Sequence, residues 1–284
     1  MTDEGTIAGR AAADSVSDFF GRFATIVLVA NSDAVDMGAL SRAHGPETLF
    51  VFFNKVYKVL SAPFAGRSLL VARSGPAGAN IVYRREVGDV LRLVAGPGFT
   101  GILNVRAGTE EVFSPAADFA GAPVGHLDLV ASAAGFYPSS HVPTSGFALA
   151  LFLSETCPSS RIVLAGFTAK RSLKWRLFED HDWTFEQIVL RLLFGSGRLH
   201  VAAGSPGGEA GSLAQIAARL DGVTPAEVAL VTAEVLAERL DTANSAIDRL
   251  IKLTRFQDRI GGWARTMKPK TRKMKLAEKA GEGS

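Results

Sequence analysis

Short apolar runs recur along most of this chain, and several of them carry polar residues only at their ends. A strand buried on both faces reads as such a run, and strands of this kind form parallel sheets covered by helices. The runs are residues 25–30, 49–53, 68–72, 81–83, 102–105, 127–132, 161–165 and 199–202. Helical patterns lie between some of them, at 35–44 and 145–156. The alternation predicts an α/β domain with a Rossmann-like, mostly parallel sheet flanked by helices.

A glycine-rich stretch separates this pattern from a helical C-terminal part. Residues 204–212 read G-S-P-G-G-E-A-G-S, which is typical of a flexible linker. Thr224-Pro225-Ala226-Glu227 then predicts a helix start, because threonine caps, proline suits the first helical position and glutamate closes a capping box. We expect four regions: an α/β domain at 1–203, a linker with a short helix at 204–223, a helical extension at 224–266 and a basic disordered tail at 267–284.

Cysteine usage and the N-terminal residues favour a reducing compartment. Cys157 is the single cysteine, so no intramolecular disulfide can form. The first residues, M-T-D-E-G, are acidic and lack the basic and apolar segments of a signal peptide. No apolar run approaches the roughly 20 residues that cross a bilayer. We expect a cytoplasmic protein, with peripheral contact with a membrane as the alternative.

Two predicted strands end in polar residues that suit a ligand. Asn31 and Ser32 follow the first strand, and Asn54 and Lys55 follow the second. Open α/β sheets bind ligands at the carboxyl ends of their strands, where amides and hydroxyls can contact a nucleotide base or phosphate. The alternatives are a plain turn that caps the next helix for Asn31-Ser32-Asp33 and an ordinary strand end with a solvated lysine after Asn54.

A polar turn, Pro143-Thr144-Ser145-Gly146, precedes the helical pattern at 145–156. Either Thr144 or Ser145 would cap this helix. The free N–H groups of a helix start attract anions, hydroxyls add donors, and glycine lets a ligand approach the backbone. The turn therefore predicts a phosphate or carboxylate site. The alternative is a helix cap without a ligand.

His181 lies in the run E-D-H-D-W-T-F-E, in which a helix beginning near Asp182 would place it at a helix start. The helix dipole disfavours a protonated imidazole and the nearby carboxylates favour it, so a histidine near its working pKa becomes a candidate general base. Glu186 is expected to support local structure. The alternative is a surface or capping histidine. The spacing matches no zinc motif, and no Walker loop, G-x-S-x-G elbow or G-x-G-x-x-G is present.

Taken together, these elements resemble the vertebrate-type sialyltransferase family, which uses CMP-activated sugars and has bacterial members. The resemblance spans about residues 24–187. The matching residues are Val29-Ala30-Asn31-Ser32 with Asn54 for the first motif, Pro143-Thr144-Ser145-Gly146, Cys157 and Gly166-Phe167 for the second, and His181 with Glu186 for the last. The resemblance implies a sialyltransferase-like variant of the GT-A fold.

The family resemblance also implies roles for these residues. The donor-binding set is Asn31, Ser32 and Asn54 for the CMP moiety, and Thr144, Ser145 and Gly146 for the phosphate or sugar carboxylate. His181 would be the catalytic base on the acceptor hydroxyl, with Glu186 and Gly166 supporting the site. The resemblance further implies inversion at the anomeric carbon, with no metal and no cofactor besides the CMP-sugar substrate.

Three departures from the family pattern bear on the substrate. Ala30 and Asp33 flank the Asn-Ser pair where the family has glycines, Cys157 has no disulfide partner, and the family's His-Tyr-Tyr motif is missing. The lone cysteine fits a cytoplasmic bacterial enzyme. The missing motif bears on the acceptor and leaves CMP-Kdo as an alternative donor.

Positive charge gathers in the sequence from Arg249 onward, although the formal net charge of the chain is only +3. The basic residues include Arg249, Lys252, Arg255, Arg259, Arg265, Lys268, Lys270, Arg272, Lys273 and Lys275. With the apolar residues between them, they predict either an interfacial membrane helix with a polybasic tail or a helix packed on the α/β domain with a solvated tail. Nucleic-acid binding is not expected, because no known motif accompanies the charge.

The leading hypothesis is a metal-independent, inverting, CMP-sugar-dependent glycosyltransferase that modifies a glycan or glycolipid precursor of a bacterial surface polysaccharide at the inner membrane face. One alternative is the same fold with CMP-Kdo or another nucleotide-sugar donor. The other is a non-catalytic, membrane-associated protein that keeps the nucleotide site.

Overall fold

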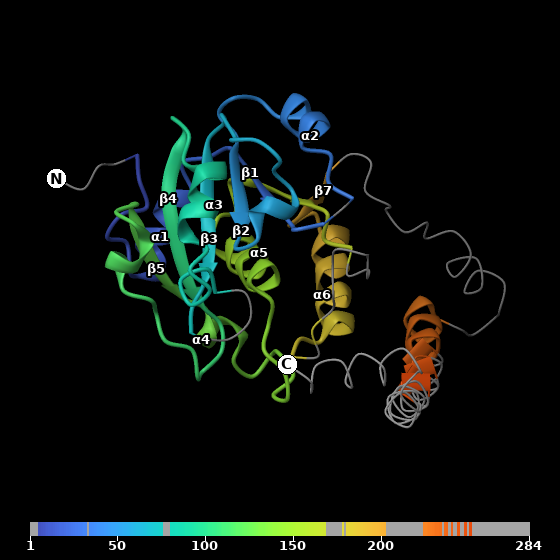
Figure 1. Ribbon diagram of the computed structural model, residues 1–284. Helices are drawn as coiled ribbons and strands as arrows, with labels where there is room; N and C mark the ends of the chain where they lie inside the picture. Colours follow the sequence, from blue (N-terminus) through green and yellow to red (C-terminus); the bar gives the residue numbers. More distant parts are fainter. Residues whose placement is uncertain are drawn as a thin grey trace, which may run out of the picture. The chain divides into compact units, whose positions relative to one another are not determined.

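The computed structural model divides the chain into two compact units, Met1–Gly207 and Gly208–Ser284 (Figure 1). The structure describes residues 5–32, 34–75, 80–168, 178 and 180–202 of the first unit. In the second unit it describes 224–251, except 235, 238–239, 241–242, 245–246 and 249. The predicted linker at 204–223, the basic residues from Arg249 on and the tail at 267–284 lie outside these ranges.

The described part of the first unit is built on one parallel sheet, with strand order β5-β4-β3-β2-β1-β6-β7. The strands are β1 (Thr25–Val29), β2 (Leu49–Phe53), β3 (Ser68–Arg73), β4 (Phe99–Arg106), β5 (Val124–Asp128), β6 (Arg161–Ala165) and β7 (His200–Val201). Helices flank the sheet (Figure 1). The sheet confirms the prediction of a Rossmann-like α/β domain.

Two apolar cores lie on opposite faces of the sheet. In β1, Ile26 and Leu28 belong to one core and Val27 and Val29 to the other, because alternate side chains of a strand point to opposite faces. The first core also contains residues of α1 (Ala13–Phe20), α5 (Ser145–Thr156) and α6 (Trp183–Gly195), and the second contains residues of α2 (Met37–Ala43) and α3 (Val87–Val94). Three shorter elements are η1 (Val56–Lys58), η2 (Ala116–Phe119) and α4 (Val130–Ala133).

Helix α5 is buried on all sides over most of its length. Every residue from Phe147 to Ser154 is buried. A helix that is apolar all round belongs in the interior of a domain. The polar turn at the start of α5 is therefore held against the sheet by a fully packed helix.

Two strand predictions were wrong. Residues 81–83 form a turn, because the Asn80 side-chain oxygen accepts hydrogen bonds from the backbone N–H groups of Val82 (2.9 Å) and Tyr83 (3.2 Å). The strand expected at 127–132 ends at Asp128, whose carboxylate accepts a hydrogen bond from the N–H of Val130 at 3.0 Å; the short helix α4 begins at Val130. In both places an Asx turn overrides an apolar run.

The order of the strands marks one position at the carboxyl edge of the sheet. From β1 to β5 the chain adds strands to one side, and β6 then pairs with the other side of β1. Ligands of open α/β sheets bind where the strand order reverses in this way. The carboxyl ends of β1 and β6 carry Asn31 and Gly166, two of the predicted site residues.

The second unit begins its described part with the predicted capping box. Thr224 Oγ1 accepts a hydrogen bond from the N–H of Glu227 at 3.2 Å, and the Glu227 carboxylate accepts one from the N–H of Thr224 at 2.8 Å. The described residues from Pro225 to Ile251 are helical. The predicted helix start at Thr224 is confirmed.

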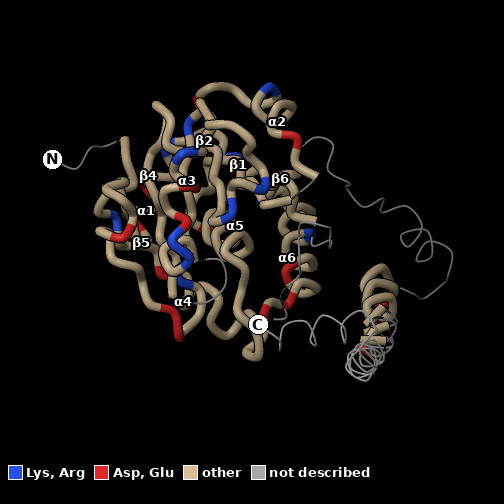
Figure 2. Tube along the Cα trace, viewed as in Figure 1, with Lys and Arg blue, Asp and Glu red and all other residues tan. Residues whose placement is uncertain are grey.

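Acidic and basic residues are interspersed along the described trace, without a long stretch of one sign (Figure 2). Among the described residues, no helix is long and apolar enough to span a membrane.

Candidate functional site

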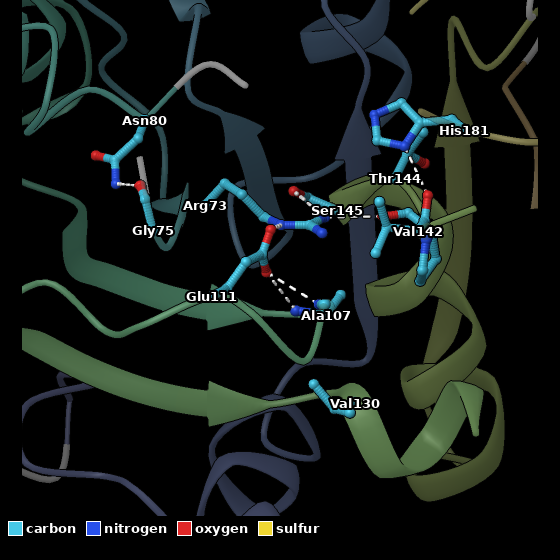
Figure 3. Close-up of polar contacts among 12 residues, drawn as sticks. Arg73, Gly75, Asn80, Ala107, Glu111, Val130, Val142, Thr144, Ser145 and His181 are labelled. Atoms are coloured by element: carbon cyan, nitrogen blue, oxygen red, sulfur yellow. Dashed lines mark hydrogen bonds and ion pairs between the residues drawn. The ribbon is translucent and has the colours of Figure 1, made fainter. Parts of the chain in front are cut away.

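The predicted site residues lie at the carboxyl edge of the sheet, and hydrogen bonds connect most of them. Figure 3 shows His181, Thr144 and Ser145 close to one another, beside Arg73 at the end of β3. Asn54 joins this group through Arg73. Residues from the ends of β1, β2 and β3 and from the N-termini of α5 and α6 therefore meet in one region.

Asn31 and Asn54 tie neighbouring strands together. The Asn31 amide nitrogen donates to the carbonyl oxygen of Phe53 at 3.2 Å, and the Asn54 side-chain oxygen accepts from the N–H of Arg73 at 3.0 Å. Both residues are 8% exposed. In the described structure Oδ1 of Asn31 and Nδ2 of Asn54 have no hydrogen-bond partner. One acceptor and one donor therefore remain for a ligand at this edge.

Ser32 forms a turn, as the alternative interpretation had it. Its hydroxyl oxygen accepts a hydrogen bond from the N–H of Ala34 at 3.2 Å. The helix cap, however, is Asp36, whose carboxylate accepts from the N–H of Ala39 at 3.0 Å. The Ser32 hydroxyl keeps its proton for another acceptor, so the predicted contact with CMP stays a prediction.

Gly166 supports the site through close packing. Its φ is +78°, and a Cβ atom at this position would lie 2.5 Å from Val35 Cγ2 and 3.0 Å from Ser32 Cβ. Glycine allows both the left-handed backbone and this approach. The end of β6 is therefore packed directly on the turn after β1.

Thr144, not Ser145, caps α5. Its hydroxyl oxygen accepts from the N–H of Phe147 at 3.1 Å and donates to the Glu186 carboxylate at 2.7 Å. The N–H of Thr144 also donates to Glu186, at 2.7 Å. Both donors of Thr144 are engaged by Glu186, which makes Thr144 a link between α5 and α6. Its predicted contact with the donor substrate stays a prediction.

Ser145 and Gly146 carry the donors of the turn that remain available. No described residue accepts a hydrogen bond from their backbone N–H groups. The Ser145 hydroxyl oxygen accepts from Arg73 Nη1 at 3.4 Å, which leaves the hydroxyl proton for another acceptor. The α-carbon of Gly146 faces the Phe167 ring, which a Cβ atom would meet at 2.7 Å. A phenyl ring, rather than a ligand, thus requires this glycine.

His181 is fixed in one tautomer immediately before α6. Its Nδ1 lies 2.6 Å from the carbonyl oxygen of Val142 (Figure 3), which can only accept, so Nδ1 carries the hydrogen and Nε2 has a free lone pair. Burial lowers the pKa of His181 below 6.5; the Val142 contact opposes this shift, and the positive charge of Arg73 adds to it. The imidazole is therefore neutral at pH 7, as a general base requires.

Glu186 is the buried link beneath the site, with an exposed fraction of 3%. Besides Thr144, it accepts a hydrogen bond from the Tyr137 hydroxyl at 3.0 Å. Burial raises the pKa of Glu186 to about 7, although the hydrogen bonds from Thr144 and Tyr137 lower it. Burial and the neighbouring Glu186 likewise raise the pKa of Tyr137. The predicted supporting role of Glu186 agrees with these contacts.

A buried ion pair that the sequence did not indicate completes the site. Arg73 Nε donates to the Glu111 carboxylate at 2.6 Å, and the two residues are 6% and 7% exposed. Arg73 Nη1 donates to the carbonyl oxygen of Pro143 at 2.8 Å. The available signal was an arginine ending the apolar run S-L-L-V-A-R; Glu111, in a loop, gave none.

Comparison with models of known protein families finds none that matches the chain, and comparison with curated proteins finds no match either. Within the described ranges, no group of three or more histidine, cysteine, aspartate or glutamate side chains is arranged to hold a metal ion.

Proposed function

We propose that this protein is an inverting glycosyltransferase of the sialyltransferase type. It would transfer a sialic acid or a related ulosonic acid such as Kdo from a CMP-activated donor to a hydroxyl group of a glycan acceptor. The observation that carries the proposal is the hydrogen bond from His181 Nδ1 to Val142, which leaves Nε2 unprotonated on a histidine that lies near the start of α5 (Figure 3).

The turn before α5 supports an anion site next to this base. The N–H groups of Ser145 and Gly146 and the Ser145 hydroxyl proton can donate to a phosphate, and the positive end of the helix dipole favours its charge. A CMP leaving group carries one phosphate, so a few fixed donors can stabilise the charge that develops on it. Asn31 Oδ1 and Asn54 Nδ2 supply an acceptor and a donor for the base or ribose.

In the proposed reaction, His181 Nε2 takes the proton of the acceptor hydroxyl as its oxygen attacks the anomeric carbon. The bond between this carbon and the phosphate oxygen breaks, and CMP leaves with the electron pair. The protonated imidazole then returns its proton to water. Attack from the face opposite CMP inverts the anomeric centre.

Titration of the purified full-length protein with CMP, CDP, UDP and GDP, with and without EDTA, tests the donor class. Selective CMP binding that EDTA does not change is the expected result. Preference for a diphosphate, or no nucleotide binding, would overturn the proposal.

Turnover then separates an enzyme from a nucleotide-binding protein. CMP-sialic acid and CMP-Kdo are offered with a panel of glycan acceptors, and release of CMP is measured with and without acceptor. Acceptor-dependent release that His181→Gln abolishes is expected. Binding of CMP without any acceptor-dependent release would favour the non-catalytic alternative.

A further inference from the structure

Arg73 lies at the centre of the site, yet it belongs to none of the sequence motifs. It is the last residue of β3, on the sheet face that α5 covers, because Leu69 and Val71 of the same strand belong to that core. Its side chain reaches between the loop after β4 and the turn before α5 (Figure 3). A fully charged group in this position needs a structural reason or a functional one.

The loop after β4 fixes one edge of the guanidinium group. Glu111 binds Arg73 Nε with one carboxylate oxygen and accepts from the N–H groups of Ala107 (2.8 Å) and Gly108 (3.1 Å) with the other. Gly75 packs on the backbone and side chain of Glu111, where a Cβ atom would lie 3.3 Å from Glu111 Cα. The carboxylate therefore has a fixed position, and it fixes the plane of the guanidinium.

The other edge of the guanidinium contacts the turn before α5, and the same turn binds His181. Arg73 Nη1 binds the carbonyl oxygen of Pro143, and the preceding carbonyl, that of Val142, accepts the hydrogen of His181 Nδ1. The N–H of Val142 donates to the carbonyl oxygen of Asp180 at 2.9 Å. Two consecutive carbonyl groups thus connect Arg73 to the histidine. Nη1 also lies 3.4 Å from the Ser145 hydroxyl oxygen.

We propose that Arg73 is a positioning residue that holds the 142–145 turn, so that His181 keeps Nε2 unprotonated and Ser145 keeps its hydroxyl proton free for a ligand. The planar guanidinium binds Glu111 through Nε and, at the same time, Pro143 and Ser145 through Nη1, whereas a lysine has a single nitrogen. The proposal rests on the proposed function only in treating His181 as the general base. The tautomer and the pKa of His181 can be measured without substrate.

The charges around His181 shift its pKa in opposite directions, and the effect of Arg73 is the largest of them. Arg73 lowers the pKa of His181, and Asp180 and Glu111 raise it by less. Replacing both members of the ion pair by neutral residues should therefore raise the pKa of His181. Replacing Arg73 by lysine keeps the charge and removes the fork, which separates the orienting effect from the electrostatic one.

The test is nitrogen NMR of the full-length protein labelled with ¹⁵N-histidine, titrated with pH. The chain has five histidines, and His181→Gln assigns the signal of interest. In the unaltered protein we expect a hydrogen on Nδ1 and a bare Nε2. In Arg73→Lys we expect a mixture of tautomers. In the double variant Arg73→Met, Glu111→Gln, which leaves no unpaired buried charge, we expect the pKa of His181 to rise.

Thr100→Val is the matched control. It removes a buried hydrogen bond of 2.8 Å to Ser68, at the opposite edge of the sheet, and destabilises the domain without touching the turn. This variant should leave the His181 signal unchanged. Unchanged tautomer and pKa in both Arg73 variants would overturn the proposal and leave Arg73 a structural ion pair. If Arg73→Lys does not fold, the double variant decides. Absence of CMP binding by the unaltered protein would instead overturn the proposed function and leave this result standing.

Discussion

His181 and Val142 are joined by a hydrogen bond of 2.6 Å between the imidazole Nδ1 and a backbone carbonyl oxygen. The two residues come from segments that are far apart in the sequence and meet at the N-termini of α5 and α6. A backbone carbonyl cannot donate, so this contact alone fixes which ring nitrogen is free. The histidine is therefore oriented before any substrate arrives.

Substitution of His181 by glutamine should abolish transfer and retain CMP binding. Loss of a positioned general base costs about 10²- to 10⁴-fold in rate, whereas the predicted CMP contacts come from other residues. Turnover and CMP affinity are measured on the same preparation. His44→Gln is the control, because His44 lies near Arg161, at the amino edge of the sheet, and should have no effect. Equal losses of binding and turnover would contradict the assignment of His181 as the base.

The pH dependence of turnover should follow His181. Its pKa is lowered from 6.5, so the basic form predominates at pH 7 and is lost as the pH falls below the lowered pKa. A plot of log kcat/KM against pH should be level near pH 7 and fall on the acidic side. A fall that begins well above pH 6.5 would be inconsistent with His181 as the base.

Substitutions of Ser145 and Thr144 should have different effects, because Ser145 is expected to contact the ligand and Thr144 to stabilise the fold. Ser145→Ala removes a free hydroxyl proton and should weaken CMP binding by about 3- to 20-fold, with little change in thermal unfolding. Thr144→Val removes the cap of α5 and one partner of Glu186, and should lower the free energy of unfolding by about 1–3 kcal/mol. Binding titrations and chemical denaturation of both variants provide the measurement; the reverse pattern would refute the assignment.

Much of the fold could be predicted from the sequence because a buried parallel strand leaves a continuous apolar run. The run at residues 49–53 coincides with β2, and the run at 161–165 coincides with β6. The same signal failed at residues 81–83, where Ile81 is fully buried but Asn80 bends the backbone into a turn. An apolar run indicates that its residues are buried, but buried residues can lie in a turn as well as in a strand.

The parts of the site that depend on neighbouring residues in the sequence could be predicted. A cap at Thr144 or Ser145 and a helix start near Asp182 follow from short patterns, and the structure has Thr144 and Asp182 as the two caps. Arg73 and Glu111 could not be paired in this way, because Arg73 ends β3 and Glu111 lies in the loop after β4, and only the fold brings the two together. The engagement of Thr144 by Glu186 is likewise a tertiary contact, so sequence reasoning could not distinguish Thr144 from Ser145 as the available hydroxyl.

Glu186 should make the stability of the first unit depend on pH. Its pKa rises from 4.5 to about 7 on folding, so the folded state binds a proton more tightly than the unfolded state. This contribution is fully present below about pH 4.5 and is lost as the pH rises to about 7. The shift of about 2.5 units corresponds to roughly 3 kcal/mol as an upper limit.

Substitution of Glu186 by glutamine should remove this dependence of the unfolding free energy on pH. Its amide oxygen can still accept from the N–H of Thr144, and it has no proton to lose. The unfolding free energies of the two proteins are measured by denaturant titration from pH 5 to pH 8. The variant should become more stable relative to the unaltered protein as the pH rises. Glu47→Gln, at an exposed glutamate, serves as the control. A constant difference across this range would mean that Glu186 titrates normally in the folded protein.

Gly166→Ala should destabilise the protein more than Gly135→Ala does. Both glycines have a left-handed backbone, with φ of +78° and +71°, so both substitutions carry a conformational cost of about 1–2 kcal/mol. A Cβ atom at Gly166 also collides with Val35 and Ser32, whereas nothing lies within 4 Å of one at Gly135. We expect the extra cost at Gly166 in the free energy of unfolding, together with weaker CMP binding, because the turn after β1 must shift. Equal destabilisation by the two substitutions would show that this turn yields freely and that β6 does not fix its position.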